Sequence, residues 1–242
     1  MKKLILLSLL LCFSVSNAQK SKKNKRVKGN EKEVTVNRTT PEYGKIEVGG
    51  SFDVKLISGK EGNITIKGDE NLVELLTTEV VNGTLKVRFE RGKMIQYNYK
   101  SKVEITIPFE QINELSFSGS GNFFGEDVIK TENLEVEIAG SGNVKLELNT
   151  INTKIERSGS GNLNIKGKNQ NLEIDSTGSG NANASDLLSD NVVANQTGSG
   201  NIKVNCSKKL VARSTGSGSI IYKGNPEKVD KSSSGSGSIS GN

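Results

Sequence analysis

The chain has 242 residues and a formal net charge of +6, and it contains no histidine and no tryptophan. The lack of histidine excludes Ser–His and Cys–His catalysis and removes the commonest general base and metal ligand. Carboxylate pairs such as Glu135 with Glu137 alternate with apolar residues, as on the solvent-facing side of a strand. We therefore expect no enzyme and no cofactor or metal site.

The first eighteen residues have the pattern of a secretory signal peptide. Lys2 and Lys3 precede an apolar run over 4–15, and Ser16 and Ala18 are the small residues that favour cleavage before Gln19. The run is too short to span a bilayer. We therefore expect an exported protein with no membrane segment after cleavage, located in the periplasm, on the outer-membrane surface or outside the cell.

Residues 19–42 are expected to form a flexible basic linker. Within this segment, the stretch 20–28 holds six basic residues and no acidic one: Lys20, Lys22, Lys23, Lys25, Arg26 and Lys28. The net charge of +6 falls to +4 without Lys2 and Lys3, and to −2 when these six are also left out. Contact of the segment with anionic lipid or polysaccharide is the alternative role. The rest of the chain is neither basic nor rich in aromatic residues, which argues against nucleic acid.

Residues 43–112 alternate between apolar and polar residues and are predicted to form strands that cap the N-terminal end of the fold. The predicted strands lie at 45–48, 52–56, 63–66 and 103–107. Asn82-Gly83 predicts a tight hairpin turn, and 71–77 is the one expected helix. Tyr97 and Tyr99 belong to the one aromatic cluster of this half of the chain, for which a core role and a ligand contact both stay open.

Residues 113–242 contain an internal repeat. Gly-Ser-Gly recurs seven times between 119 and 237, at spacings of 18 to 21 residues. Apolar residues occur at even offsets from the first glycine of each triplet, as Val136 and Val144 do around Gly140. Period-two alternation places them on one inward face of extended strands. The repeat therefore predicts an all-β, single-stranded β-helix, or solenoid, with coils of about 19 residues, in one domain over 43–242.

Both glycines of each triplet occupy the same alternate positions as the inward-facing apolar residues. They therefore lie where the coil is too narrow for a side chain, or they adopt a positive φ at a corner. The polar residues between them align in columns. In one interpretation, the side chains of these columns only stabilise the stacked turns through hydrogen bonds to the backbone. In the other, they form a flat polar face of seven rungs, about 30 Å long, that binds a repetitive partner such as a glycan. This candidate ligand face comprises Ser120, Ser141, Ser160, Ser179, Ser199, Ser217, Asn122, Asn143, Asn162, Asn181 and Asn201, together with Tyr97 and Tyr99.

Cys206 is the only cysteine outside the predicted signal peptide, so no intramolecular disulfide is expected. It is either a small residue at a solenoid corner or a reactive thiol.

Several segments carry a resemblance to a known family. They are Phe52-Asp53-Val54, the segment 68–72, Asn82-Gly83-Thr84-Leu85 and the repeated Ser-Gly-Ser-Gly-Asn. Together they resemble the autotransporter adhesins with a head GIN domain, secreted β-solenoid proteins of gram-negative bacteria, over 45–242. The resemblance implies a right-handed β-helix at the cell envelope or surface and supplies no catalytic residues. We expect a binding or adhesion protein whose partner is a glycan or an envelope component; a periplasmic scaffold without a small ligand is the alternative, and a carbohydrate-active enzyme on a β-helix is the remote one.

Overall fold

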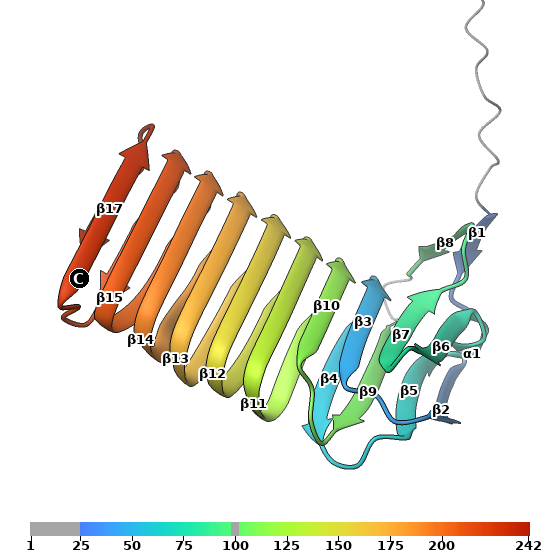
Figure 1. Cartoon of the computed structure of the whole chain (residues 1–242). Helices are drawn as coiled ribbons and strands as arrows, with labels where there is room; N and C mark the ends of the chain where they lie inside the picture. The colour runs from blue at the N-terminus through green and yellow to red at the C-terminus, as the bar shows by residue number, and fades with distance from the viewer. Residues whose placement is uncertain (1–24, 98–101) are drawn as a thin grey trace, which may run out of the picture.

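The protein folds as a row of stacked β-coils closed at its N-terminal end by shorter strands (Figure 1). The computed structural model describes residues 25–97 and 102–242. The predicted signal peptide, residues 19–24 and Tyr99 therefore lie outside the described residues. The described part is nearly all β and forms a solenoid of about seven turns with coils of about 19 residues, which confirms the predicted fold class.

One long, bent strand makes each central coil. Each of these strands begins just after one Gly-Ser-Gly triplet and ends at the first glycine of the next, and neighbours pair in parallel, as Val136 does with Leu115 and Ile155. The strands of this kind are β11 (Phe123–Gly140), β12 (Val144–Gly159), β13 (Leu163–Gly178), β14 (Ala182–Gly198) and β15 (Ile202–Gly216). Shorter strands of the same stack are β10 (Glu114–Gly119), β16 (Ile220–Lys223), β17 (Lys228–Ser234) and β18 (Ile239–Gly241).

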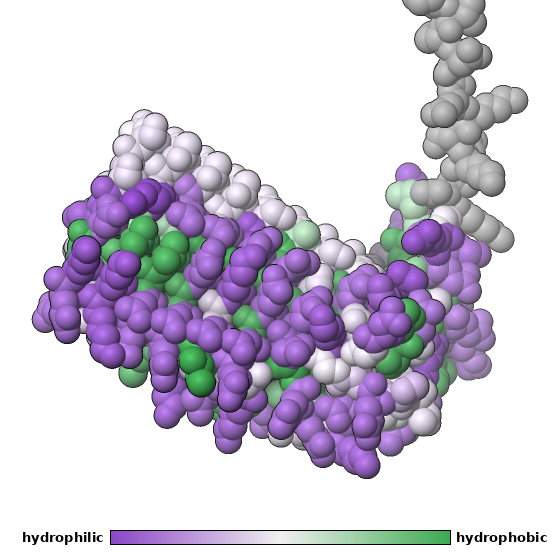
Figure 2. Space-filling model, viewed as in Figure 1, coloured by the Kyte–Doolittle hydropathy of each residue, from purple (hydrophilic) through white to green (hydrophobic). Residues whose placement is uncertain are grey.

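The predicted alternation of inward and outward residues is confirmed along the coils. Val136, Ile155 and Ile174 stack inside and are at most 2% exposed. The outward positions are mostly polar, and hydrophilic side chains cover most of the face seen in Figure 2. Because each coil buries its apolar side only against its neighbours, the core is one continuous column along the stack.

Polar residues also enter this interior, which the sequence analysis had described as apolar. The buried Arg157 takes an inward position between Ile138 and Ser176. Its Nε donates to Ser176 Oγ over 3.1 Å, and its terminal nitrogens donate to the carbonyls of Gly161 and Gly180. Burial lowers the pKa of the guanidinium, but arginine stays charged in proteins. Backbone carbonyls at the triplets thus stabilise a buried cation.

The two glycines of each triplet meet different requirements. Gly159 has a φ of +114°, a region that side-chain-bearing residues rarely adopt. A Cβ on Gly161 would lie 2.0 Å from the carbonyl oxygen of Gly142 in the preceding coil. The backbone N–H groups of Ser160 and Gly161 both donate to Gly140 O, over 3.0 and 3.1 Å. Gly159 therefore has the predicted positive φ, whereas at Gly161 the backbone of the preceding coil, and not a narrow coil, excludes a side chain.

The N-terminal region continues the stack and then ends it with antiparallel pairs. β3 and β4 stack in parallel on β10 and β11, whereas β2 pairs with β5 and β6 with β7 in antiparallel fashion. The elements are β1 (Lys25–Lys28), β2 (Glu33–Thr39), β3 (Lys45–Gly50), β4 (Asp53–Ser58), β5 (Asn63–Asp69), α1 (Glu70–Val73), β6 (Leu76–Val81), β7 (Thr84–Phe89), β8 (Lys93–Gln96) and β9 (Val103–Phe109). The four predicted strands are present, and the predicted turn has φ values of 51° at Asn82 and 73° at Gly83.

Two segments differ from expectation. Part of the expected linker forms β1 and β2, because Val34 and Val36 pack against the core and Arg38 Nη2 donates to the carbonyl of Val73 over 2.7 Å. The helix expected over 71–77 is only the four residues of α1, because the chain enters β6 at Leu76 and pairs with β7.

Replacing Gly161 with alanine is expected to destabilise the fold by about 2 kcal/mol or more, because the added Cβ overlaps the backbone of the preceding coil. Chemical denaturation followed by circular dichroism measures this loss. The control is Gly44→Ala, where an added Cβ meets nothing within 4 Å and a change within about 0.5 kcal/mol is expected. Equal losses for both variants would contradict a close contact between triplets.

Candidate functional site

The predicted serine and asparagine columns exist as stacked rows at one corner of the coils. All six serines are exposed. The asparagines form a hydrogen-bonded row, the first ladder, in which each Nδ2 donates to the Oδ1 of the preceding coil. The distance is 3.0 Å from Asn143 to Asn122, and 3.1 Å from Asn162 to Asn143.

Most amide oxygens of the first ladder accept two hydrogen bonds. Asn143 Oδ1 accepts from the backbone nitrogen and Nδ2 of Asn162, over 3.3 and 3.1 Å. Asn181 Oδ1 accepts from both groups of Asn201 over 3.1 Å. An amide oxygen has two lone pairs, so these oxygens are already satisfied within the protein. The hydrogen bonds of the first ladder therefore stabilise the turn at this corner of the coils.

Of the two tyrosines in the predicted ligand face, the structure describes one. Tyr99 lies outside the described residues, whereas Tyr97 packs half-buried against the core. Burial, and then the charge of Asp53, raises the pKa of Tyr97. Asp53 also accepts from the backbone and side chain of Asn122 over 2.9 Å. Tyr97 therefore lies toward the N-terminal end of the first ladder.

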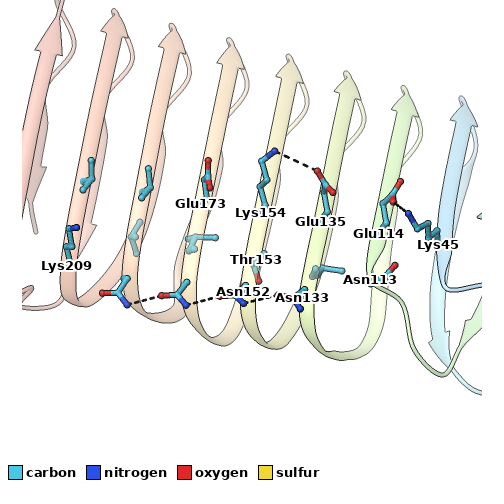
Figure 3. Close-up of a pocket in the computed structure, with 17 residues that line it drawn as sticks. Lys45, Asn113, Glu114, Asn133, Glu135, Asn152, Thr153, Lys154, Glu173 and Lys209 are labelled. Carbon is cyan, nitrogen blue, oxygen red and sulfur yellow. Dashed lines mark hydrogen bonds and ion pairs between the residues drawn. The ribbon is translucent and has the colours of Figure 1, made fainter.

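A second asparagine row, absent from the predicted face, lies at another bend of the coils (Figure 3). The second ladder consists of Asn133, Asn152, Asn171 and Asn191. Its amides bond from coil to coil over 2.8, 2.8 and 2.9 Å. Its sequence signal is an asparagine seven residues before the first glycine of four successive triplets. None of these four residues is among the candidate site residues predicted from the sequence.

The second ladder borders a groove of about 690 Å³ that crosses the strands from β3 to β15. The other border is a row of outward side chains two residues further along each strand: Lys45, Glu114, Glu135, Lys154, Glu173, Val193 and Val211. A neighbouring groove of about 850 Å³, which shares Asn113 and Asn133, contains Lys130, Thr150 and Gln170. None of the serines or asparagines of the first corner lines either of these two grooves.

The charges of the first groove balance. Three lysines and three glutamates line it. Lys45 Nζ lies 2.5 Å from Glu114, and Lys154 Nζ lies 3.8 Å from Glu135 and 2.5 Å from Glu156. The hydrogen bond to Glu114 raises the pKa of Lys45. Such exposed pairs contribute little to stability, but they leave the groove without a strong electrostatic preference for a charged ligand.

The second ladder keeps free acceptor capacity that most amide oxygens of the first ladder lack. Asn152 donates once, to Asn133, and its oxygen accepts once, from Asn171. An asparagine side chain has two N–H donors and two lone pairs. Within the described residues, Asn152 and Asn171 each therefore retain one donor and one acceptor along the groove. A ligand with regularly spaced polar groups can use them.

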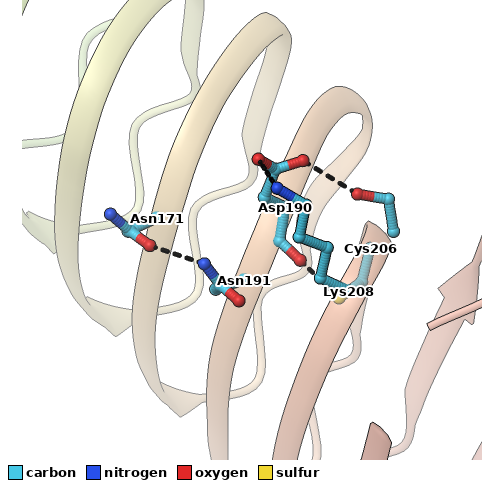
Figure 4. A network of polar contacts seen from close by, with 6 residues as sticks. Asn171, Asp190, Asn191, Cys206 and Lys208 are labelled. Atoms are coloured by element: carbon cyan, nitrogen blue, oxygen red, sulfur yellow. Dashed lines mark hydrogen bonds and ion pairs between the residues drawn. The ribbon is translucent and has the colours of Figure 1, made fainter. Parts of the chain in front are cut away.

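The Cys206 thiol is buried in the core, and Figure 4 shows it beside Asp190 and Lys208. Its Sγ lies 3.4 Å from the carbonyl oxygen of Asp190, to which it donates. Lys208 Nζ lies 2.9 Å from the Asp190 carboxylate and holds the pKa of that carboxyl below its usual value. Burial raises the pKa of the thiol. Because the thiolate is the reactive form, this environment favours the structural role over the reactive one.

We expect Cys206 to resist a water-soluble thiol reagent in the native protein at neutral pH and to react fully in denaturant, because it is buried and protonated. Absorbance of the released thiolate measures the reaction. Labelling of the native protein as fast as that of the denatured protein would show that Cys206 is accessible and reactive.

Over 25–97 and 102–242, no group of three or more Cys, Asp or Glu residues is arranged to hold a metal ion. In the same part of the chain, no helix has the length and apolar character needed to cross a membrane.

Comparisons with known proteins agree with the geometry of the coils. A family model described as "Putative auto-transporter adhesin, head GIN domain" matches residues 42–226. The chain belongs to this family. No curated protein matches the chain.

Solved structures of family-like proteins share the fold. A "putative adhesin" from Bacteroides fragilis NCTC 9343 is 30% identical, with a TM-score of 0.84 over 89% of this chain and 100% of that one. A "putative lipid binding protein" from Parabacteroides distasonis ATCC 8503 is also 30% identical, with a TM-score of 0.73 over 90% of this chain and 100% of that one. A "putative adhesin" from Parabacteroides merdae ATCC 43184, 23% identical over 90% of this chain and 99% of that one, has a TM-score of 0.75 and shows the fold alone. The names of the family and of the more similar structures suggest binding at a surface.

Proposed function

We propose that the protein is an exported, non-catalytic binding protein of the cell envelope that holds an extended polymer along the groove beside the second ladder. The pattern of the first eighteen residues supports export. The family description and the names of the similar structures support a binding role. The ligand runs along the stack of coils, across β10 to β15.

The observation that carries this proposal is the open row of amides in a neutral groove. The rungs of the second ladder repeat at the coil spacing of about 4.8 Å, and Asn152 and Asn171 keep a donor and an acceptor each. The lining lysines and glutamates cancel in charge. A polymer whose polar groups repeat along its length can bond to several rungs at once, so weak single contacts add up.

The two ladders provide a matched test. In the Asn152→Leu, Asn171→Leu double variant, we expect binding to polysaccharide-containing envelope extract to weaken about tenfold, because two hydrogen-bonding rungs are lost. In the control, Asn143→Leu with Asn162→Leu, the same chemical change falls on the first ladder, outside the groove. Its binding is expected to change by less than about twofold.

Binding is measured by co-sedimentation of the purified protein with the extract, and thermal unfolding of both variants shows whether their folding losses match. Equal binding by the wild type and both variants would contradict the groove as the site. No saturable binding by the wild-type protein would instead support a periplasmic scaffold without a ligand.

A further inference from the structure

The groove changes chemistry along its length. Over β10 to β13 the outward row is charged, and over β14 and β15 it continues as Val193 and Val211. Val193 is apolar and yet 36% exposed, because it occupies an outward position that is charged in the preceding coils. Figure 2 shows apolar surface among the hydrophilic side chains over the coils toward the C-terminus. The ligand that fits this groove therefore offers both polar groups and small apolar ones.

The spacing of the rungs disfavours an extended polypeptide as the ligand. A strand advances about 3.3 Å per residue, so its like-facing groups repeat at about 6.6 Å, out of step with rungs about 4.8 Å apart. Peptide recognition by strand addition also needs a free sheet edge. The second ladder instead lies on the face of coils that are paired on both sides, as β13 is with β12 and β14.

An acyl chain fits the valines but not the ladder. It would cover the remaining N–H of Asn152 and Asn171 without accepting a hydrogen bond, and a buried donor without a partner weakens binding. Strongly charged polymers are disfavoured because the groove's three lysines and three glutamates cancel. The remaining class is an uncharged polymer that carries hydrogen-bonding groups at short, regular intervals.

We propose that the groove recognises a linear, uncharged polysaccharide that carries acetamido groups, an inference that rests on the proposed function. An acetamido group has one N–H and one carbonyl, which complement the free acceptor and the free donor of Asn152 and of Asn171. Asn191 and Val193 lie two residues apart on one outward face, about 6.6 Å from each other along the strand. The amide of an acetamido group can therefore bond to the ladder while its methyl contacts Val193 or Val211.

The inference is tested with three β-1,4-linked oligosaccharides of equal length, made of N-acetylglucosamine, glucosamine or glucose. Isothermal titration calorimetry at physiological salt is expected to show about tenfold tighter binding of the N-acetylated oligomer than of the glucose oligomer. Val193→Thr with Val211→Thr, which keeps side-chain shape but adds hydroxyls, is expected to reduce this preference to about threefold or less. Val81→Thr, at an exposed valine of the cap hairpin, is the control and keeps it.

Equal affinity for the N-acetylated and glucose oligomers, lost in the Asn152→Leu, Asn171→Leu variant, would overturn the acetamido inference and leave the proposed function standing. Binding of phosphatidylethanolamine vesicles at the groove, with none of the oligosaccharides, would overturn it in favour of a lipid. If neither these probes nor envelope extract binds, the proposed function fails as well.

Discussion

The close approach of peptide backbones at the Gly-Ser-Gly triplets is the constraint on which the rest of the structure depends. At the second glycine of five successive triplets, from Gly142 to Gly218, a Cβ would lie only 1.9 to 2.0 Å from the carbonyl oxygen of the glycine one coil earlier. Only glycine allows this contact. Every coil brings a glycine to the same place at intervals of 18 to 21 residues, and equivalent residues stack in register apart from local bulges.

Because successive coils stack in register, a residue type that recurs in the repeat forms a row along the solenoid. The backbone and side chains around a row determine how much of its hydrogen-bonding capacity stays free. The two asparagine ladders have the same side chain and the same coil-to-coil hydrogen bond. At the triplet corner, the next backbone N–H also reaches the amide oxygen and satisfies it, as Asn162 does for Asn143. At the other bend, Asn152 Oδ1 accepts only one hydrogen bond, from Asn171 Nδ2. One ladder therefore stabilises the turn, whereas the other keeps free groups beside a groove.

The same rule accounts for the interior. Positions that point inward are filled by apolar side chains in most coils, but the column two residues before the triplet passes from Phe117 and Ile138 to Arg157 and Ser176. The carbonyls of nearby triplet glycines supply the acceptors that Arg157 needs. A column near the corner can therefore be polar, because an unpaired buried charge would be costly while this one is paired with backbone dipoles.

The sequence by itself determined the solenoid, the coil length and the inward residues, because a repeat with period-two alternation has few ways to bury its apolar side. It also showed both asparagine columns by their spacing, although only the triplet column was recognised as a candidate site. Only the tertiary structure decided that Val34, Val36 and Arg38 bring part of the expected linker into the cap, since their partners lie far along the chain. It alone decided which ladder borders a groove, because that depends on how each bend of the coil directs its backbone N–H groups and on the outward row two residues away.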